Sequence, residues 1–172
     1  AYFSAALGCK SGATSTVSTR TVIEQTLGFF EKNPLIKPRK INFRNDLYDY
    51  LSEKCDSKEP ARLVEIERVI KKHLPIDNEE LLETAKELIN KLNSSEHEVS
   101  SAFRVNKTGL NRYKRIVSKN DRWNLEFDKR ILGSDSSAIF YYDERKKTLT
   151  INSLSENDIS SIEQELNERK IK

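Results

Sequence analysis

The spacing of the apolar residues changes along the chain, and this change constrains the fold more than any other feature. As far as Leu92, apolar side chains recur every three or four residues, which is the period of an amphipathic helix. From Trp123 onward, apolar and polar residues alternate, as they do in a half-buried strand. The sequence therefore predicts an α+β protein with a helical N-terminal portion, followed by a small antiparallel-sheet domain with a C-terminal helix.

The N-terminal portion is predicted to contain a short strand over residues 2–7 and then four helices. The helices are expected over about 18–32, over about 42–55, from a first turn holding Pro60 to Leu74, and from an N-cap at Asp77, with Glu80 reaching back, to Leu92. The stretch 93–98 is polar and small enough to be a linker, although a short loop before a further strand would look similar. We therefore expect residues 1–95 to form the strand and helical region and residues 96–172 to form a small α+β domain.

The second domain is predicted to contain a β-hairpin and a capped helix. Residues 139–142 are apolar on both sides, which indicates a central or doubly covered strand, and they are expected to pair with 148–151 through the polar turn 143–147. The last helix has Leu154 before it, Ser155 as N-cap and Asp158 in the capping-box position.

Residues 113–117 allow two interpretations. They could form a strand that pairs with 123–127, or a helix whose inner side holds Leu110, Tyr113 and Val117.

Motifs for catalysis, metal binding and nucleotide binding are missing from the sequence. Cys9 and Cys55 do not form a C-x-x-C pair, and His73 and His97 stand alone. The five glycines do not form a phosphate-binding loop, and no apolar stretch is long enough to cross a membrane. We therefore expect no catalytic residue, metal site, cofactor or membrane partner, and we expect the protein not to be an enzyme.

The positive charge of the chain is small in total but locally concentrated. Its net charge is only +3, yet residues 99–120 hold six basic side chains and no acidic one. Because DNA affinity comes mainly from neutralising phosphates, this run together with the next arginine predicts a DNA contact. The predicted contact residues are Arg104, Lys107, Arg112, Lys114, Arg115, Lys119 and Arg122. In the alternative interpretation, the same side chains only solvate a loop and protect an edge strand.

Several segments of the second half occur in a familiar order. They are Phe103, Asn124-Leu125-Glu126-Phe127-Asp128, Ile131-Leu132-Gly133, Ile139-Phe140-Tyr141-Tyr142-Asp143 and Thr148-Leu149-Thr150-Ile151. In the first half, Tyr2-Phe3, Gly8 and Phe29-Phe30 fit the same pattern. Taken together, the chain resembles the bacterial nucleoid-associated proteins of the NdpA/YejK type. The resemblance covers only the C-terminal half of the family's length, and because the chain also lacks Met, we expect it to be a fragment of a longer protein.

The resemblance implies a cytoplasmic bacterial protein of the nucleoid that binds double-stranded DNA with little sequence preference and is not an enzyme. Self-association or contact with other nucleoid proteins is a further expectation. Two alternatives remain open. The amphipathic helices could form a protein-interaction or oligomerisation module of a larger bacterial protein, or the chain could be a defence-associated relative that senses foreign DNA.

Overall fold

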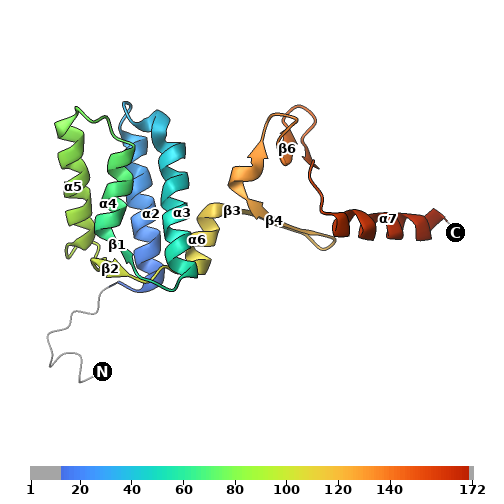
Figure 1. The fold of residues 1–172 in the computed structure, drawn as a ribbon, viewed down its shortest axis with the longest axis horizontal. Helices are drawn as coiled ribbons and strands as arrows, with labels where there is room; N and C mark the ends of the chain where they lie inside the picture. Colours follow the sequence, from blue (N-terminus) through green and yellow to red (C-terminus); the bar gives the residue numbers. More distant parts are fainter. Residues whose placement is uncertain (1–12, 171–172) are drawn as a thin grey trace, which may run out of the picture. The chain divides into compact units, whose positions relative to one another are not determined.

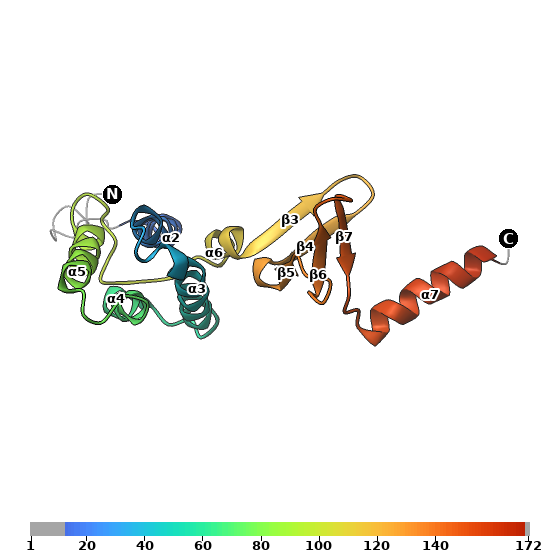
Figure 2. The same ribbon diagram turned by 90° about the horizontal axis from the view of Figure 1, so that it is seen from above.

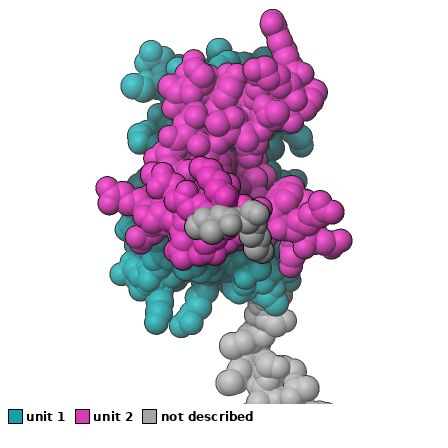
Figure 3. Space-filling view, turned by 90° about the vertical axis from the view of Figure 1, so that its right-hand side faces the viewer, with its two compact units in different colours: residues 1–113 teal, residues 114–172 magenta. Residues whose placement is uncertain are grey.

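The computed structural model describes residues 13–170 and divides the chain into two compact units. Unit 1 comprises residues 1–113 and unit 2 residues 114–172, drawn in teal and magenta in Figure 3. The predicted strand over 2–7 and Cys9 lie outside the described residues. Helices dominate unit 1, and unit 2 holds small sheets and a last helix, so the predicted α+β class is confirmed (Figure 1).

Unit 1 is a group of helices that lie side by side, with one short strand pair at their end (Figures 1 and 2). Its elements are α2 (Ser15–Lys32), the 3₁₀ helix η1 (Lys37–Arg39), α3 (Lys40–Asp56), β1 (Ala61–Arg62), α4 (Leu63–Lys72), α5 (Glu79–Asn93), β2 (Ala102–Phe103) and α6 (Lys107–Lys114). The four predicted helices correspond to α2, α3, α4 and α5.

Two predicted helix starts are wrong. Pro60 does not enter the first turn of α4, because the chain first forms β1, which pairs antiparallel with β2. The N-cap of α5 is Asn78 and not Asp77, since the Asn78 Oδ1 accepts the Leu81 N–H at 2.9 Å. A two-residue strand and the choice between neighbouring capping residues leave no periodic signal in a sequence.

The core of unit 1 is formed by the apolar stripes that the helical period predicted. Val22, Leu47, Ile66 and Ile89 are buried on successive helices. Phe30 of α2 stacks on the ring of Phe43 in α3, with 4.2 Å between the ring centroids. The predicted helices therefore bury their apolar sides against one another.

The division between the units falls after Tyr113, so the predicted boundary at residue 95 lies inside unit 1. The polar stretch 93–98 forms a surface turn that returns the chain to the helices, and the Val99 N–H donates to the Leu92 carbonyl at 3.0 Å. Val99, Phe103 and Leu110 are then buried in the helical core. Polar residues look the same in a tight turn as in a linker, so their composition does not distinguish the two.

Unit 2 contains two small sheets. Strand β3 (Arg115–Lys119) pairs antiparallel with β4 (Asn124–Asp128), and the 3₁₀ helix η2 (Lys129–Ile131) follows. The second sheet has the order β5-β6-β7, with β5 (Leu132–Gly133) parallel to β6 (Phe140–Asp143) and β7 (Thr148–Ile151) antiparallel to it.

These strands settle three expectations. The hairpin of β6 and β7 is confirmed, and β6 is the central strand. It is not covered on both faces, because Tyr142 is exposed. Both interpretations of residues 113–117 are partly right, since α6 continues to Lys114 and β3 begins at Arg115.

The last helix, α7 (Glu156–Lys170), begins with the predicted capping box. The Asp158 N–H donates to Ser155 Oγ at 3.2 Å, and the Ser155 N–H donates back to the Asp158 carboxylate at 3.2 Å. No residue of α7 is buried, and Phe127 is the only buried residue among residues 114–170. Unit 2 therefore has almost no core of its own.

Candidate nucleic-acid interface

The β3–β4 hairpin separates its side chains onto two faces. Residues directly opposite each other share a face, so Arg115, Val117 and Lys119 lie with Asp128, Glu126 and Asn124 on what we call the outer face. The other face carries Ile116, Ser118, Leu125 and Phe127, which line an apolar pocket of about 520 Å³ together with Trp123. The basic residues of β3 therefore project away from the apolar pocket.

The outer face is not purely basic, because β4 supplies two carboxylates. Glu126 accepts from the Arg115 guanidinium at 2.7 Å. Asp128 accepts from the Arg130 side chain at 3.0 Å and from the Arg130 N–H at 2.9 Å. Partial burial of Asp128 acts to raise the pKa of its carboxyl, but these hydrogen bonds outweigh it and the pKa is lowered. The Arg115–Glu126 ion pair across the hairpin thus neutralises part of the excess positive charge of residues 99–120.

The structure distributes the seven predicted contact residues over both units. Three belong to unit 1, with Arg104 in the loop before α6 and Lys107 and Arg112 on α6 itself. Four belong to unit 2. Lys114 and Arg115 lie at the start of the hairpin, and Lys119 and Arg122 lie beside its turn. No single unit carries the whole set.

These seven residues differ in whether another side chain already neutralises them. Lys107 lies 3.4 Å from Asp56, Arg115 is paired with Glu126, and Lys114 interacts electrostatically with Asp128. The others form no ion pair within residues 13–170; they are Arg104, Arg112, Lys119 and Arg122. These four, which we call the unpaired cations, are exposed and available to a phosphate.

A closed turn holds the two unpaired cations of the hairpin. The Asn120 side-chain oxygen accepts the backbone N–H groups of Arg122 and Trp123 at 2.8 and 3.0 Å. The Asn120 N–H donates to the Trp123 carbonyl at 3.0 Å, which extends the pairing by one residue beyond β4. Lys119 and Arg122 are thus presented from a backbone whose hydrogen bonds are satisfied.

One further basic residue lies near this turn and was missed in the sequence. Lys147, from the turn between β6 and β7, lines the same pocket as Ser118 and Trp123. It has a φ of 55°, and Asp143 accepts two backbone N–H groups in the same turn. The three consecutive basic residues 145–147 were the available signal, but they were read only as a polar turn.

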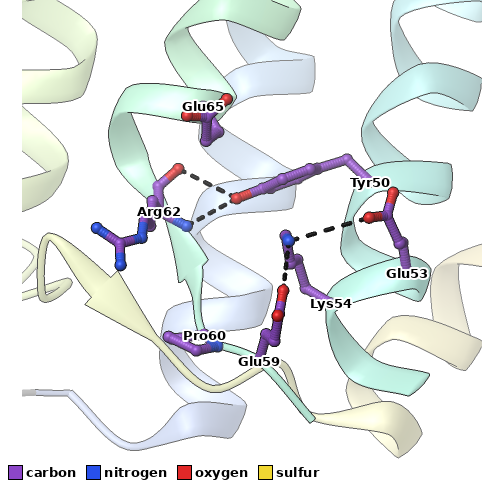
Figure 4. Close-up of a pocket in the computed structure, with 7 residues that line it drawn as sticks. All are labelled: Tyr50, Glu53, Lys54, Glu59, Pro60, Arg62 and Glu65. Atoms are coloured by element: carbon purple, nitrogen blue, oxygen red, sulfur yellow. Dashed lines mark hydrogen bonds and ion pairs between the residues drawn. The ribbon is translucent and has the colours of Figure 1, made fainter. Parts of the chain in front are cut away.

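The pocket shown in Figure 4 is of a different kind. It has a volume of about 510 Å³ and lies in unit 1 between α3 and the start of α4. The Tyr50 hydroxyl accepts the Arg62 N–H at 2.8 Å, and Lys54 pairs with Glu59 at 2.7 Å (Figure 4). These contacts join α3 to β1 and its preceding loop.

Two other kinds of site are absent from the described part of the chain. Residues 13–170 contain no cluster of three or more His, Cys, Asp or Glu side chains that could hold a metal ion. In the same range, no helix has the length and apolar character needed to cross a bilayer.

Comparison with known proteins assigns the chain to a family. The family model described as "Nucleoid-associated protein YejK" matches residues 1–159. The chain is 25% identical over 153 residues to a nucleoid-associated protein of Pseudomonas entomophila, and 23% identical over 153 residues to one of Pseudomonas aeruginosa. These matches cover 89% of this chain but only 42% and 41% of the relatives, so the chain spans less than half of their length. The chain belongs to the YejK family of nucleoid-associated proteins.

Proposed function

We propose that the chain binds double-stranded DNA in the bacterial nucleoid through the phosphate backbone, without catalysing a reaction. One observation carries this proposal: four exposed cations between residues 104 and 122 have no ion-pair partner in residues 13–170. Unpaired lysines and arginines at a surface release counterions when they meet phosphates, which is the main source of DNA affinity. The names of the relatives, which are nucleoid-associated proteins, support the same ligand.

The form of the hairpin favours binding with little sequence preference. Lys119 and Arg122 flank a turn, and no neighbouring side chain fixes them in the forked geometry that reads a guanine edge. Cations of this kind position a protein on the backbone but carry no sequence information. We therefore expect similar affinities for duplexes of unrelated sequence.

The first test is whether the chain itself binds DNA, since it spans only part of its relatives' length. Fluorescence anisotropy with a labelled random-sequence duplex at two salt concentrations measures the affinity, and an RNA duplex of equal length serves as comparison. We expect binding at low salt that weakens steeply when salt is added. An absence of binding at low salt would contradict the proposal for this part of the protein.

The interaction-module alternative was based on the amphipathic helices of the first half. Their apolar stripes pack against one another in the core of unit 1, so these stripes are not available to a partner. The exposed apolar surface of α7 and of the neighbouring strands lies in unit 2 instead. Unit 1 also exposes apolar side chains outside these stripes, among them Ile41 and Ile76.

A further inference from the structure

The segment 104–113 is fixed onto helix α2 at two points. Near its start, the Asn106 N–H donates to the hydroxyl of Thr19, a fully buried residue of α2, at 2.9 Å. At its end, the Tyr113 hydroxyl donates to the Glu24 carboxylate at 2.6 Å. The loop before α6 and α6 itself therefore run alongside the stretch 19–24 of α2 (Figures 1 and 2).

Arg20 of α2 lies between these two contacts. At about 100° per residue around the helix, its side chain points between the directions of Thr19 and Glu24. Arg20 is exposed and forms no ion pair in the described part of the chain. Burial and the hydrogen bond to Glu24 raise the pKa of Tyr113 to about 12, and the charge of Arg20 acts against this rise because its guanidinium lies near that hydroxyl.

Helix α6 presents Arg112 beside the same contact. Lys107 points to α3, where it lies 3.4 Å from Asp56, and Tyr113 points to α2. Arg112 follows Lys107 by five residues, which is about 140° around the helix, and it neighbours Tyr113 on the side away from Lys107. Arg112 and Arg20 thus border one contact between α2 and α6, although the two residues are distant in sequence.

We propose that Arg20 binds a DNA phosphate together with Arg104 and Arg112, so that unit 1 carries a three-arginine contact of its own. Arg104 belongs to this set because it is exposed and lies two residues before Asn106, at the other end of the contact with α2. Exposed arginines without an ion-pair partner suit phosphate oxygens. The inference rests on the proposed function and adds to it a residue from outside the basic run.

Tyr113 keeps the nearest carboxylate on α2 away from Arg20. Glu24 follows Arg20 by four residues, which is a spacing at which opposite charges pair on a helix. No ion pair joins them within residues 13–170, and the Glu24 carboxylate accepts from the Tyr113 hydroxyl instead. Without that hydroxyl, Glu24 is free to pair with Arg20 and to neutralise it. Tyr113 is therefore a positioning residue for the Arg20 contact.

The test is a set of salt titrations of the 172-residue chain with a labelled random-sequence duplex, read by fluorescence anisotropy. Arg20→Gln should reduce the slope of log K against log salt by about 0.9, on top of what the four unpaired cations contribute. Between roughly 50 and 200 mM salt, the wild type then loses about 3.5-fold more affinity than this variant.

Arg39→Gln is the matched control, because Arg39 is also exposed and has no ion pair among the described residues. It lies at the start of α3, about 25 Å from the end of that helix, where Asp56 contacts α6. Its slope should equal that of the wild type. The thermal transition of unit 1 shows for each variant that the chain is folded.

Tyr113→Phe removes no charge, yet it should reduce the slope as much as Arg20→Gln does, because Glu24 then pairs with Arg20. Adding Glu24→Gln to it should restore the wild-type slope, which a merely structural role of Tyr113 does not predict. A slope that this second change does not restore overturns the positioning role.

The failure of this inference differs from the failure of the proposed function. A wild-type chain that does not bind the duplex at low salt overturns both. A wild-type chain that binds, with an unchanged slope in Arg20→Gln, overturns the contact of Arg20 and leaves the proposed function standing. An equal reduction in Arg39→Gln overturns the contact too, since the effect would then follow the net charge and not the position.

Discussion

Replacing Lys119 and Arg122 with alanine should halve the salt dependence of DNA binding. Each phosphate neutralised on B-DNA contributes about 0.9 to the slope of log K against log salt. If the four unpaired cations all contact phosphates, the slope is about −3.6, which is an affinity loss of about 150-fold between roughly 50 and 200 mM salt. With two of them removed, the slope is about −1.8 and the loss over the same range is only about 12-fold.

The ion pair of Arg115 gives this experiment two internal controls. Arg115→Ala should leave the slope nearly unchanged, because Glu126 already neutralises that guanidinium at 2.7 Å. Glu126→Gln should have the opposite effect, since it releases Arg115 and makes the slope steeper by about 0.9. Lys86→Ala on α5, outside the run, removes one exposed charge that is paired with Glu83 and should change nothing.

Anisotropy titrations of one labelled random-sequence duplex, repeated at four or more salt concentrations, give each slope directly. A double variant with the wild-type slope would refute the assignment of Lys119 and Arg122 to the phosphates. A wild-type slope near −6.3 would refute the distinction between paired and unpaired cations, because all seven predicted residues would then contribute.

Three further predictions concern stability. Leu47→Ala should lower the free energy of unfolding of unit 1 by about 2–5 kcal/mol in urea titrations, because this side chain is fully buried; a smaller change would mean that the core collapses around the cavity. Ser155→Ala removes the cap of α7 and should cost about 0.5–2 kcal/mol of helix stability, seen as lost far-ultraviolet helicity with an unchanged transition of unit 1. Hydrogen bonds from Lys37 and Lys40 lower the pKa of Glu31 from 4.5 to about 2, so its stabilising contribution is complete above about pH 4.5 and is lost as the pH falls toward 2. Carboxylate NMR should show this low midpoint, which Lys37→Ala raises; a midpoint near 4.5 in the wild type would contradict the ion pairs.

The helices were predictable because each buries one side in a common core. Val22, Phe30 and Leu47 are apolar at positions that a helical period brings together, and the structure buries all three. The strand pair of Ala61 and Phe103 was not predictable, since two residues show no period and their pairing joins distant parts of the chain. Local patterns report local structure, whereas long-range pairs depend on the whole fold.

The candidate interface was predictable in part for the same reason. The basic run gives the positions of the cations along the chain, but it could not show which of them are already neutralised. Glu126 reaches Arg115 only because β3 and β4 pair in one particular register, and Asp56 reaches Lys107 across an even longer separation in sequence. Choosing the unpaired cations therefore needed the fold.

The single buried side chain of unit 2 has a consequence for the fate of newly made copies. Phe127 stacks on Phe140 with 4.1 Å between the ring centroids, and almost every other apolar group of the unit remains in contact with water. A unit with so little interior gains stability chiefly from what it binds, in proportion to the logarithm of the concentration of that partner. Copies whose unit 2 is unbound would then open often enough for proteases to cut them, whereas bound copies would be protected, so turnover would remove the unbound protein first.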